Sequence, residues 1–200
     1  MIKPDISYVT NIHEFYEEIK RQQSGAHGVE YLAHHNALIE KAKECETIKE
    51  IGVCQGATLA AMMLTNPKKL IGFDIMPKYF NPYKKHFDDY AKENDIDFEF
   101  IVGDSINPKI THEVDMLHID SLHKPEHLMK ELIIHAPKVK KYIAFHDTAN
   151  YKNTSGLLVA LARYITEIDQ SWRIVDHYIH RVGYTVIERV DNRLQYMDKS

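Results

Sequence analysis

One stretch of the sequence carries most of the information about the fold: Glu50-Ile51-Gly52-Val53-Cys54-Gln55-Gly56-Ala57-Thr58. Residues 47–53 are typical of a short buried strand, and the residues after the stretch are typical of the start of a helix. Gly52 and Gly56 therefore lie in a strand-to-helix turn, where the backbone bends sharply and can approach a ligand. A second apolar strand, residues 69–74, ends in the carboxylate of Asp74. A strand, a glycine turn, a helix and a second strand that ends in a carboxylate are typical, in this order, of a nucleoside-binding half of a doubly wound sheet.

Strands and helices alternate through most of the remaining chain. Two amphipathic helices, residues 9–23 and 29–44, come first, and Ser24-Gly25-Ala26-His27-Gly28 separates them. After the glycine turn, the pattern predicts helix 57–64, strand 69–74, a polar helix ending near residue 94, strands 97–102 and 114–120, helix 125–136, strand 141–145 and helix 154–168. Residues 172–179 and 182–190 are rich in β-branched residues, which predicts an antiparallel hairpin.

This order of elements predicts an α/β fold. We expect a doubly wound, mostly parallel Rossmann-like sheet built from five strand–helix steps, with an antiparallel C-terminal hairpin and N-terminal helices. The length suits a single domain over residues 1–200, with an N-terminal helical segment, 1–45, and a Rossmann-like core, 46–190. The N-terminal helices are candidates for a homo-oligomer surface or for a lid over an acceptor pocket.

The composition argues against several classes of protein. The net charge of -4 gives no basic surface for nucleic acid or an anionic membrane. No apolar run approaches the roughly 20 residues that span a bilayer, and the first residues lack the apolar core of a signal peptide. Two cysteines, Cys45 and Cys54, cannot build a disulfide framework, so we expect a cytoplasmic protein. Thirteen histidines favour a search for a metal or acid–base site.

Polar side chains occur at the end of every predicted parallel strand. Ligands of open α/β sheets bind outside the carboxyl ends of the strands. The residues concerned are Glu50, Asp74, Asp104-Ser105, Asp120 and His146-Asp147. One carboxylate alone is as easily explained as a cap of the following helix. Five such positions at one sheet edge predict a site there.

These motifs, in this order, resemble those of class I S-adenosylmethionine-dependent methyltransferases. The resemblance is to the branch with cephalosporin-hydroxylase-like proteins and metal-dependent sugar O-methyltransferases, and it covers about residues 29–189. The matching motifs are Glu50-x-Gly52-x-x-x-Gly56-x-Thr58, Gly72-Phe73-Asp74, Val102-Gly103-Asp104-Ser105, His118-Ile119-Asp120 with His123, and Phe145-His146-Asp147-Thr148. A terminal hairpin that inserts an antiparallel strand into the sheet is also a feature of that fold.

The resemblance implies S-adenosylmethionine as cofactor. The cofactor-binding residues that it implies are Glu50, Gly52, Gly56, Thr58, Asp74, Asp104, Ser105 and Asp120. In this scheme the two glycines let the backbone approach the methionine moiety, with Glu50 near its amino group. Asp74 would accept hydrogen bonds from both ribose hydroxyls, and Asp104 from the adenine amino group, with Ser105 adjacent. Cys54 stands where a dinucleotide-binding turn has its middle glycine, which argues against a nicotinamide cofactor.

The resemblance also implies a reacting end with four candidate catalytic residues: Asp120, His123, His146 and Asp147. In the metal-dependent relatives, carboxylates after the fourth and fifth strands hold magnesium, which lowers the pKa of the acceptor hydroxyl. The corresponding metal ligands here are Asp120, His146 and Asp147, and a histidine in the set shifts the preference from magnesium toward manganese, iron or zinc.

The motif after the fourth strand departs from the family pattern. The family has Asp-Gly-Asp-His, and this chain has Asp120-Ser121-Leu122-His123. Leu122 removes one carboxylate from the metal site. Two alternatives therefore stay open: a divalent metal site, or a metal-free cluster in which His123 or His146 is the general base and a carboxylate orients it.

The sequence as a whole predicts a methyltransferase that O-methylates a small-molecule acceptor, either a sugar or a secondary metabolite. One alternative from another class is a catalytically silent cofactor-binding module, which the missing carboxylate at Leu122 favours. A metal-dependent hydrolase that uses the histidines and aspartates is a second alternative, but it leaves Asp74 and Asp104 without a role. A nicotinamide-dependent oxidoreductase on the same sheet architecture is a third.

Overall fold

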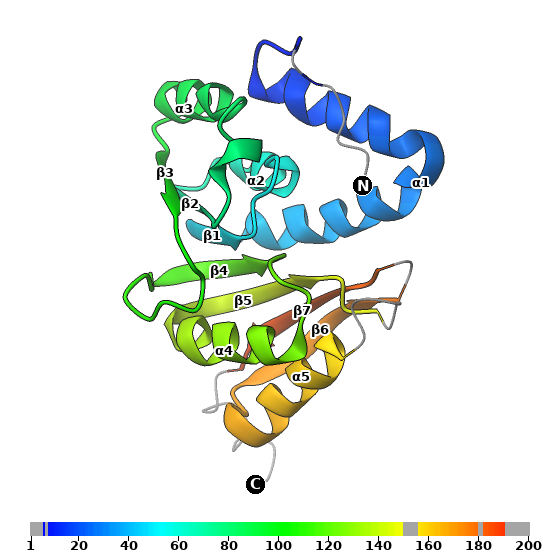
Figure 1. Cartoon of the computed structure of the whole chain (residues 1–200), viewed down its shortest axis with the longest axis vertical. Coiled ribbons are helices and arrows are strands. Elements are labelled where there is room, and N and C mark those ends of the chain that lie inside the picture. The colour runs from blue at the N-terminus through cyan, green and yellow to red at the C-terminus, as the bar shows by residue number, and fades with distance from the viewer. Residues whose placement is uncertain (1–5, 7, 150–155, 180–181, 191–200) are drawn as a thin grey trace, which may run out of the picture.

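The computed structural model describes residues 6, 8–149, 156–179 and 182–190, and for residues 23–33 it describes the backbone only. Its centre is one seven-stranded sheet (Figure 1). In spatial order the strands are β3 (Asp97–Val102), β2 (Lys69–Asp74), β1 (Thr47–Ile51), β4 (Val114–Ile119), β5 (Val139–His146), β7 (Tyr184–Arg189) and β6 (Trp172–Tyr178). All neighbours pair in parallel except β7, which runs antiparallel to both β5 and β6. The predicted fold class is confirmed.

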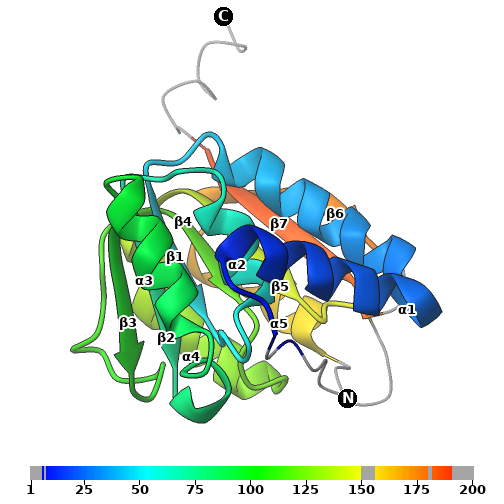
Figure 2. The ribbon, with the colours of Figure 1, turned by 90° about the horizontal axis from the view of Figure 1, so that it is seen from above.

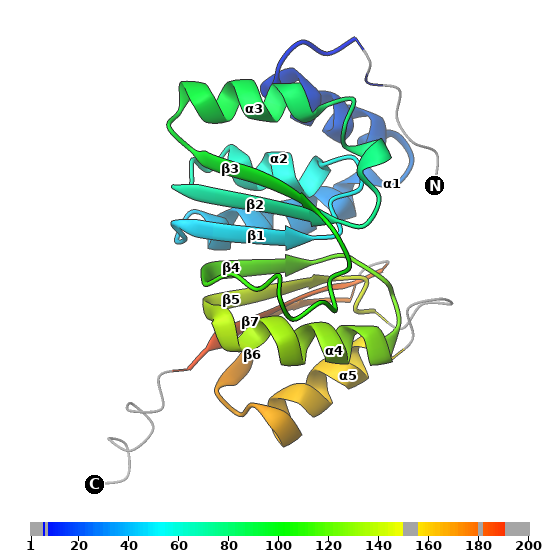
Figure 3. The same cartoon turned by 60° about the vertical axis from the view of Figure 1, so that its left-hand side comes forward.

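Helices cover both faces of this sheet. They are α1 (Ile12–Ala42), α2 (Ala57–Met63), α3 (Lys84–Glu93), α4 (Pro125–His135) and α5 (Leu157–Arg163), and a π-helix, Tyr164–Ile168, extends α5. Figures 2 and 3 show α1, α2 and α3 on one face, and α4 and α5 on the other. Short 3-10 turns lie at Pro77–Tyr79 and Ala136–Lys138. Within the described residues, no helix is long and apolar enough to cross a membrane.

The prediction of two separate N-terminal helices is wrong, because α1 is one helix through residues 24–28. It nevertheless turns back on itself, as Figure 1 shows. The Tyr16 hydroxyl lies 3.0 Å from His35 Nδ1, although 19 residues separate them. A straight helix would place these residues about 28 Å apart. Gly25 and Gly28 each cost a helix only about 1 kcal/mol, which packing of the two halves offsets.

Alternation along the strands sorts side chains into two cores. Ile48 of β1 faces the core under α1, α2 and α3, and Ile51 faces the core under α4 and α5. Strand β1 is buried on both faces, as expected for a central parallel strand. Its Lys49 is almost fully buried, and the ammonium donates to the Ile110 carbonyl oxygen at 3.0 Å.

Lys49 thereby anchors the connection between β3 and β4. Residues 103–113, all of which the structure describes, contain no helix, and the predicted elements also include none between strands 97–102 and 114–120. The predicted count of five strand–helix steps is therefore too high by one. The loop that connects the two strands carries Asp104 and Ser105 at its start. Two hydrogen bonds hold this loop, one from Lys49 of β1 to the Ile110 carbonyl and one from His135 of α4 to the Ser105 carbonyl.

One buried histidine should make stability depend on pH. Burial lowers the pKa of His135 to about 4, and its Nε2 donates to the Ser105 carbonyl oxygen at 2.8 Å. Because the unfolded chain takes up this proton near its ordinary pKa of 6.5, the folded state loses stability as pH falls from there to about 4. We expect a loss of about 3 kcal/mol from this group. Urea unfolding of wild type and His135→Gln between pH 7 and 4 measures it. The variant should lose less stability, and equal slopes would contradict the assignment.

Candidate functional site

The ends of β1 and β4 meet at the edge of the sheet where the predicted site residues lie. The Gly52 N–H donates to the Phe73 carbonyl, and the Asp120 N–H donates to the Ile51 carbonyl, each at 2.8 Å. Gly52 has a φ of +91°, and a Cβ there would lie 2.0 Å from the carbonyl oxygen of Asp120. The glycine is thus required by close backbone packing. Its approach to a ligand stays a prediction.

The second glycine of the turn begins α2. Gly56 has a φ of +93°, and a Cβ on it would touch the rings of Phe80 and Phe87 at 3.0 Å. Two residues further on, the Thr58 hydroxyl donates to the carboxylate of Glu50. The helix start is therefore fixed both by aromatic packing and by a hydrogen bond back to the strand.

Glu50 of β1 is fully buried. Its Oε1 accepts from Thr58 and lies 3.1 Å from His118 Nδ1 on β4, and burial raises the pKa of the carboxyl. Its other oxygen, Oε2, has no hydrogen-bond partner among the described residues. A buried acceptor without a partner costs roughly 1–3 kcal/mol, so this oxygen fits a bound ammonium group.

Asp74 joins the glycine turn to the end of β2. One carboxylate oxygen accepts from the Cys54 N–H at 2.8 Å, and the other from the Met76 N–H at 2.7 Å. Cys54 takes a left-handed φ of 51° to make this contact. Each oxygen keeps a further lone pair, so the oriented carboxylate can still accept from a vicinal diol.

Residues 104 and 105 separate into two roles. Asp104 is exposed, and its Oδ1 accepts from the Ile106 N–H at 3.1 Å, which leaves the carboxylate accessible to a ligand. Ser105 is buried, and its hydroxyl donates to Glu131 Oε1 at 2.6 Å. The hydroxyl of Ser105 is thus hydrogen-bonded to α4, and the expected place of Ser105 beside adenine stays a prediction.

The structure brings together the four residues predicted at the reacting end. His123 Nε2 lies 2.8 Å from Asp147 Oδ2 and 3.2 Å from Asp120 Oδ1. His146 Nδ1 lies 3.5 Å from Asp120 Oδ1 and from Asp147 Oδ1. We call these four residues the acid–histidine cluster. Asp147 adopts a left-handed φ of 60°, a backbone strain that turns its carboxylate toward both histidines.

Charges within the acid–histidine cluster stabilise one another. Hydrogen bonds to Asp120 and then Asp147 raise the pKa of His123 to about 10. Burial lowers the pKa of His146, but the same two carboxylates outweigh it and raise the value to about 10. Burial works against ionisation of Asp120 and Asp147, yet His146 and His123 hold both carboxyl pKa values below the ordinary range. Two carboxylates therefore face two imidazolium groups.

Three members of the cluster could hold a cation. Ligand atoms of Asp120, His146 and Asp147 all lie within 4.8 Å of one another. Two oxygens and one nitrogen suit manganese or iron better than magnesium, which prefers oxygen alone. The space that Asp120, His123 and His146 line is about 10 Å³, room for about one water molecule. An acceptor must therefore approach His123, which is 38% exposed, from outside.

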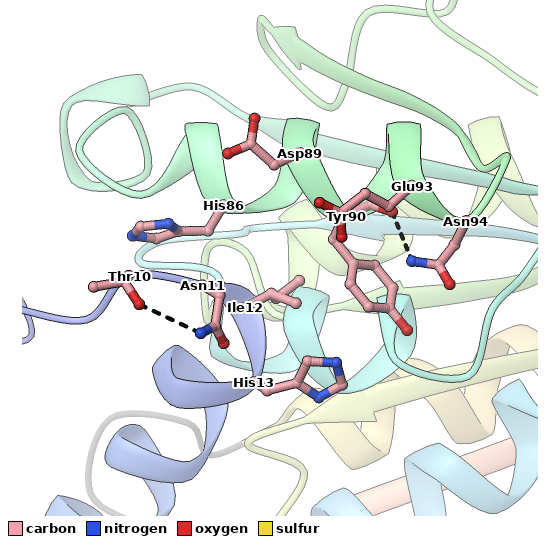
Figure 4. Close-up of a pocket in the computed structure, with 9 residues that line it drawn as sticks. All are labelled: Thr10, Asn11, Ile12, His13, His86, Asp89, Tyr90, Glu93 and Asn94. Carbon is pink, nitrogen blue, oxygen red and sulfur yellow. Dashed lines mark hydrogen bonds between the residues drawn. The ribbon is translucent and has the colours of Figure 1, made fainter.

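A larger cleft lies elsewhere, between the start of α1 and α3 (Figure 4). Its volume is about 340 Å³, and it is lined by Thr10, Asn11, Ile12, His13, His86, Asp89, Tyr90, Glu93 and Asn94. The His13 and Tyr90 rings meet edge to face at 5.4 Å. None of the predicted site residues lines this cleft. It is separate from the strand-end site.

Sequence reasoning missed the buried partners of the site. Glu131 on α4 is fully buried and receives hydrogen bonds from Ser105 and Ser121. His118 contacts Glu50, and the centroids of the His118 ring and the Tyr184 ring of β7 are 6.0 Å apart. His127, Glu131 and His135 follow one another at intervals of four residues along α4, beside the buried Leu128 and Leu132. This spacing places Glu131 on the buried side of the helix and could have revealed it.

Comparison with known proteins supports the fold. No protein-family model matches the sequence, and no curated protein is similar to it at a significant level. A methyltransferase from Podospora anserina, solved with S-adenosylhomocysteine, is 16% identical, covers 92% of this chain and 89% of its own, and has a TM-score of 0.59. The magnesium protoporphyrin IX methyltransferase of Synechocystis PCC 6803, solved with S-adenosylmethionine, is 10% identical, with coverages of 94% and 86% and a TM-score of 0.64.

A third structure is similar along nearly its whole length. It is a proposed O-methyltransferase from Klebsiella pneumoniae, 14% identical, with coverages of 96% and 93% and a TM-score of 0.60. Identities this low show the fold alone. The chain has the fold of class I methyltransferases.

The contact between Gly52 and Asp120 can be tested by substitution. We expect Gly52→Ala to lower the free energy of unfolding by about 2 kcal/mol or more, because the residue needs positive φ and its Cβ would overlap a carbonyl oxygen. Gly72→Ala is the matched control, since the Cβ there meets only side-chain atoms, at 3.0 Å or more. Denaturant unfolding of the three proteins gives the comparison, and an equal or larger loss in the control would contradict the explanation.

Proposed function

We propose that this protein is an S-adenosylmethionine-dependent methyltransferase that methylates an oxygen of a small polar acceptor, either a sugar or a secondary metabolite. The observation that carries the proposal is the acid–histidine cluster at the ends of β4 and β5, on a sheet whose neighbouring strand ends carry Asp74 and Asp104. Structural likeness to methyltransferases, one of them a proposed O-methyltransferase, supports the reaction class.

Residues at the strand ends fit the chemistry of the cofactor. Asp74 is oriented by two backbone N–H groups and retains lone pairs for the ribose hydroxyls. Glu50 offers the unpartnered oxygen Oε2 to the amino group, and Asp104 is exposed for the adenine amino group. Bound S-adenosylmethionine would supply an electrophilic methyl group. Glu50, Asp74 and Asp104 lie on neighbouring strands or directly after them, so one extended ligand along this edge of the sheet could contact all three.

The chain's own residues would orient the acceptor and handle its proton. His123 is the most exposed member of the acid–histidine cluster, and its Nε2–H is directed at Asp147 and Asp120. Its Nε2 would take a proton from an acceptor hydroxyl only after it has given its own proton to one of these carboxylates. Asp147 and Asp120 fix the ring of His123 through that nitrogen. Where a cation is bound, Asp120, His146 and Asp147 would hold it, and it would supply positive charge beside the acceptor oxygen.

The second candidate function is a catalytically silent cofactor-binding module, and the exposure of Leu122 favours it. Leu122 is 51% exposed at the position where the family pattern has a carboxylate. An exposed leucine beside the cluster suits a protein that binds the cofactor without turning it over. Binding of S-adenosylmethionine with no methyl transfer to any acceptor of a broad panel would favour this candidate.

Cofactor affinity tests the first half of the proposal. Calorimetric titration should show that wild type binds S-adenosylmethionine and S-adenosylhomocysteine but not NAD. We expect Asp74→Ala to weaken binding by about 2 kcal/mol or more, because hydrogen bonds from the ribose to a charged group are lost. Asp88→Ala is the control, since Asp88 only pairs with Lys84 on the surface of α3. Unchanged affinity in the Asp74 variant would sink the cofactor assignment.

Turnover tests the second half. We expect Asp147→Ala to lower methyl transfer by about a hundredfold, in line with the loss of positioned acid–base catalysis, while affinity for S-adenosylhomocysteine stays within a factor of about two. Radiolabelled methyl transfer to a panel of sugars and phenolic metabolites, with and without magnesium or manganese, is the measurement. A parallel loss of cofactor affinity would mean that Asp147 is structural and that the reacting end lies elsewhere.

A further inference from the structure

Helix α4 turns a row of three polar residues toward the sheet edge: His127, Glu131 and His135, spaced by four. We call this row the α4 stripe. The side chains of Glu131 and His135 are buried, and that of His127 is 18% exposed. A buried polar side chain lowers stability unless it is hydrogen-bonded. The stripe therefore needs partners, and it finds them in two loops.

Glu131 binds both loops at once. Its Oε1 accepts from the Ser105 hydroxyl at 2.6 Å, and the Ser121 hydroxyl lies 2.7 and 2.8 Å from its two oxygens. His127 Nε2 lies 3.2 Å from the same Oε1. One helix turn further on, His135 holds the Ser105 carbonyl oxygen. Ser105 is thus fixed through its side chain and its backbone.

The two serines stand next to residues of the proposed site. Ser105 follows Asp104 in the loop after β3, and Ser121 follows Asp120 in the loop after β4. Ser121 also occupies the place of the glycine in the family motif. A glycine could not make the bond to Glu131, so this departure from the family pattern has a structural explanation in the present chain.

We propose that Glu131 is a positioning residue that couples the adenine end of the cofactor site to the acid–histidine cluster. The inference rests on the proposed function, because it takes Asp104 as a cofactor-binding residue. Glu131 is held rigidly in the middle of α4, and its carboxylate is the shared acceptor of both loops. When one serine hydroxyl is lost, the Glu131 carboxylate lacks a hydrogen-bond donor and changes position. The serine of the other loop, which is bonded to the same carboxylate, then moves with it.

A double-mutant cycle on cofactor affinity tests the coupling. The variants are Ser121→Ala, Glu131→Gln and the pair together, each titrated calorimetrically with S-adenosylhomocysteine. We expect Ser121→Ala to raise Kd about fivefold, although this hydroxyl bonds Glu131 and Ser121 is not among the predicted cofactor-binding residues. The double variant should bind no more weakly than Glu131→Gln alone, because both changes break the same connection.

Ser171→Ala is the matched control. Its hydroxyl also bonds a carboxylate, that of Asp169, and accepts from Arg189 at 2.8 Å, but it lies where β6 begins. This variant should lower the melting temperature and leave Kd unchanged. A role of Glu131 in stability alone would give the same pattern for Ser121→Ala, with a lower melting temperature and unchanged Kd.

The outcomes separate the inference from the proposed function. Failure of wild type to bind S-adenosylhomocysteine would overturn the proposed function and the inference with it. Binding by wild type, with Kd unchanged in Ser121→Ala or with additive effects in the double variant, would overturn the inference alone. Should Glu131→Gln fail to fold, a cycle of Ser105→Ala and Ser121→Ala measures the same coupling, and additive effects there would overturn it.

Discussion

Gly52 and Asp120 touch through their backbones where β1 and β4 end side by side. At this point the strand order reverses, since β2 and β3 lie on one side and β5, β7 and β6 on the other. Open α/β sheets bind ligands outside the carboxyl ends of the strands, at the point where the strand order reverses. Asp74 is bonded to the loop after β1 through the Cys54 N–H, and Asp120 of the acid–histidine cluster begins the loop after β4.

Charge pairing is the second constraint on the site. Each buried acid is placed against a histidine or a hydroxyl: Glu50 against Thr58 and His118, Glu131 against two serines and His127, and Asp147 against His123. Acids that share an edge would repel one another without these partners. The histidines of the site thus have a physical role, because His146 and His123 keep Asp120 and Asp147 ionised and His118 is a partner of the buried Glu50.

Sequence patterns predicted the elements whose signals are local. Strands β2 and β3 begin and end where expected, since apolar runs bounded by turn residues define them. The continuous helix α1 was not predicted, because glycines that usually end helices are tolerated when a folded-back partner covers them. Local patterns cannot report a partner 19 residues away.

The same limit applies to the candidate site. Asp120, His123, His146 and Asp147 were found because each follows a predictable strand end. Ser105 was placed beside a ligand for the same reason, yet its hydroxyl direction depends on α4, which lies 26 residues further along the chain at Glu131. Side-chain direction at a strand end is a tertiary property, and the motif specifies only the position.

The order of the strands leaves β3 and β6 as the two borders of the sheet. Outward charges mark both: Asp97 and Glu99 are exposed on β3, and Arg173 is exposed on β6. Ionic side chains on a border strand oppose its extension by a strand from another molecule. Copies of this protein should therefore resist stacking edge to edge into a continuous sheet.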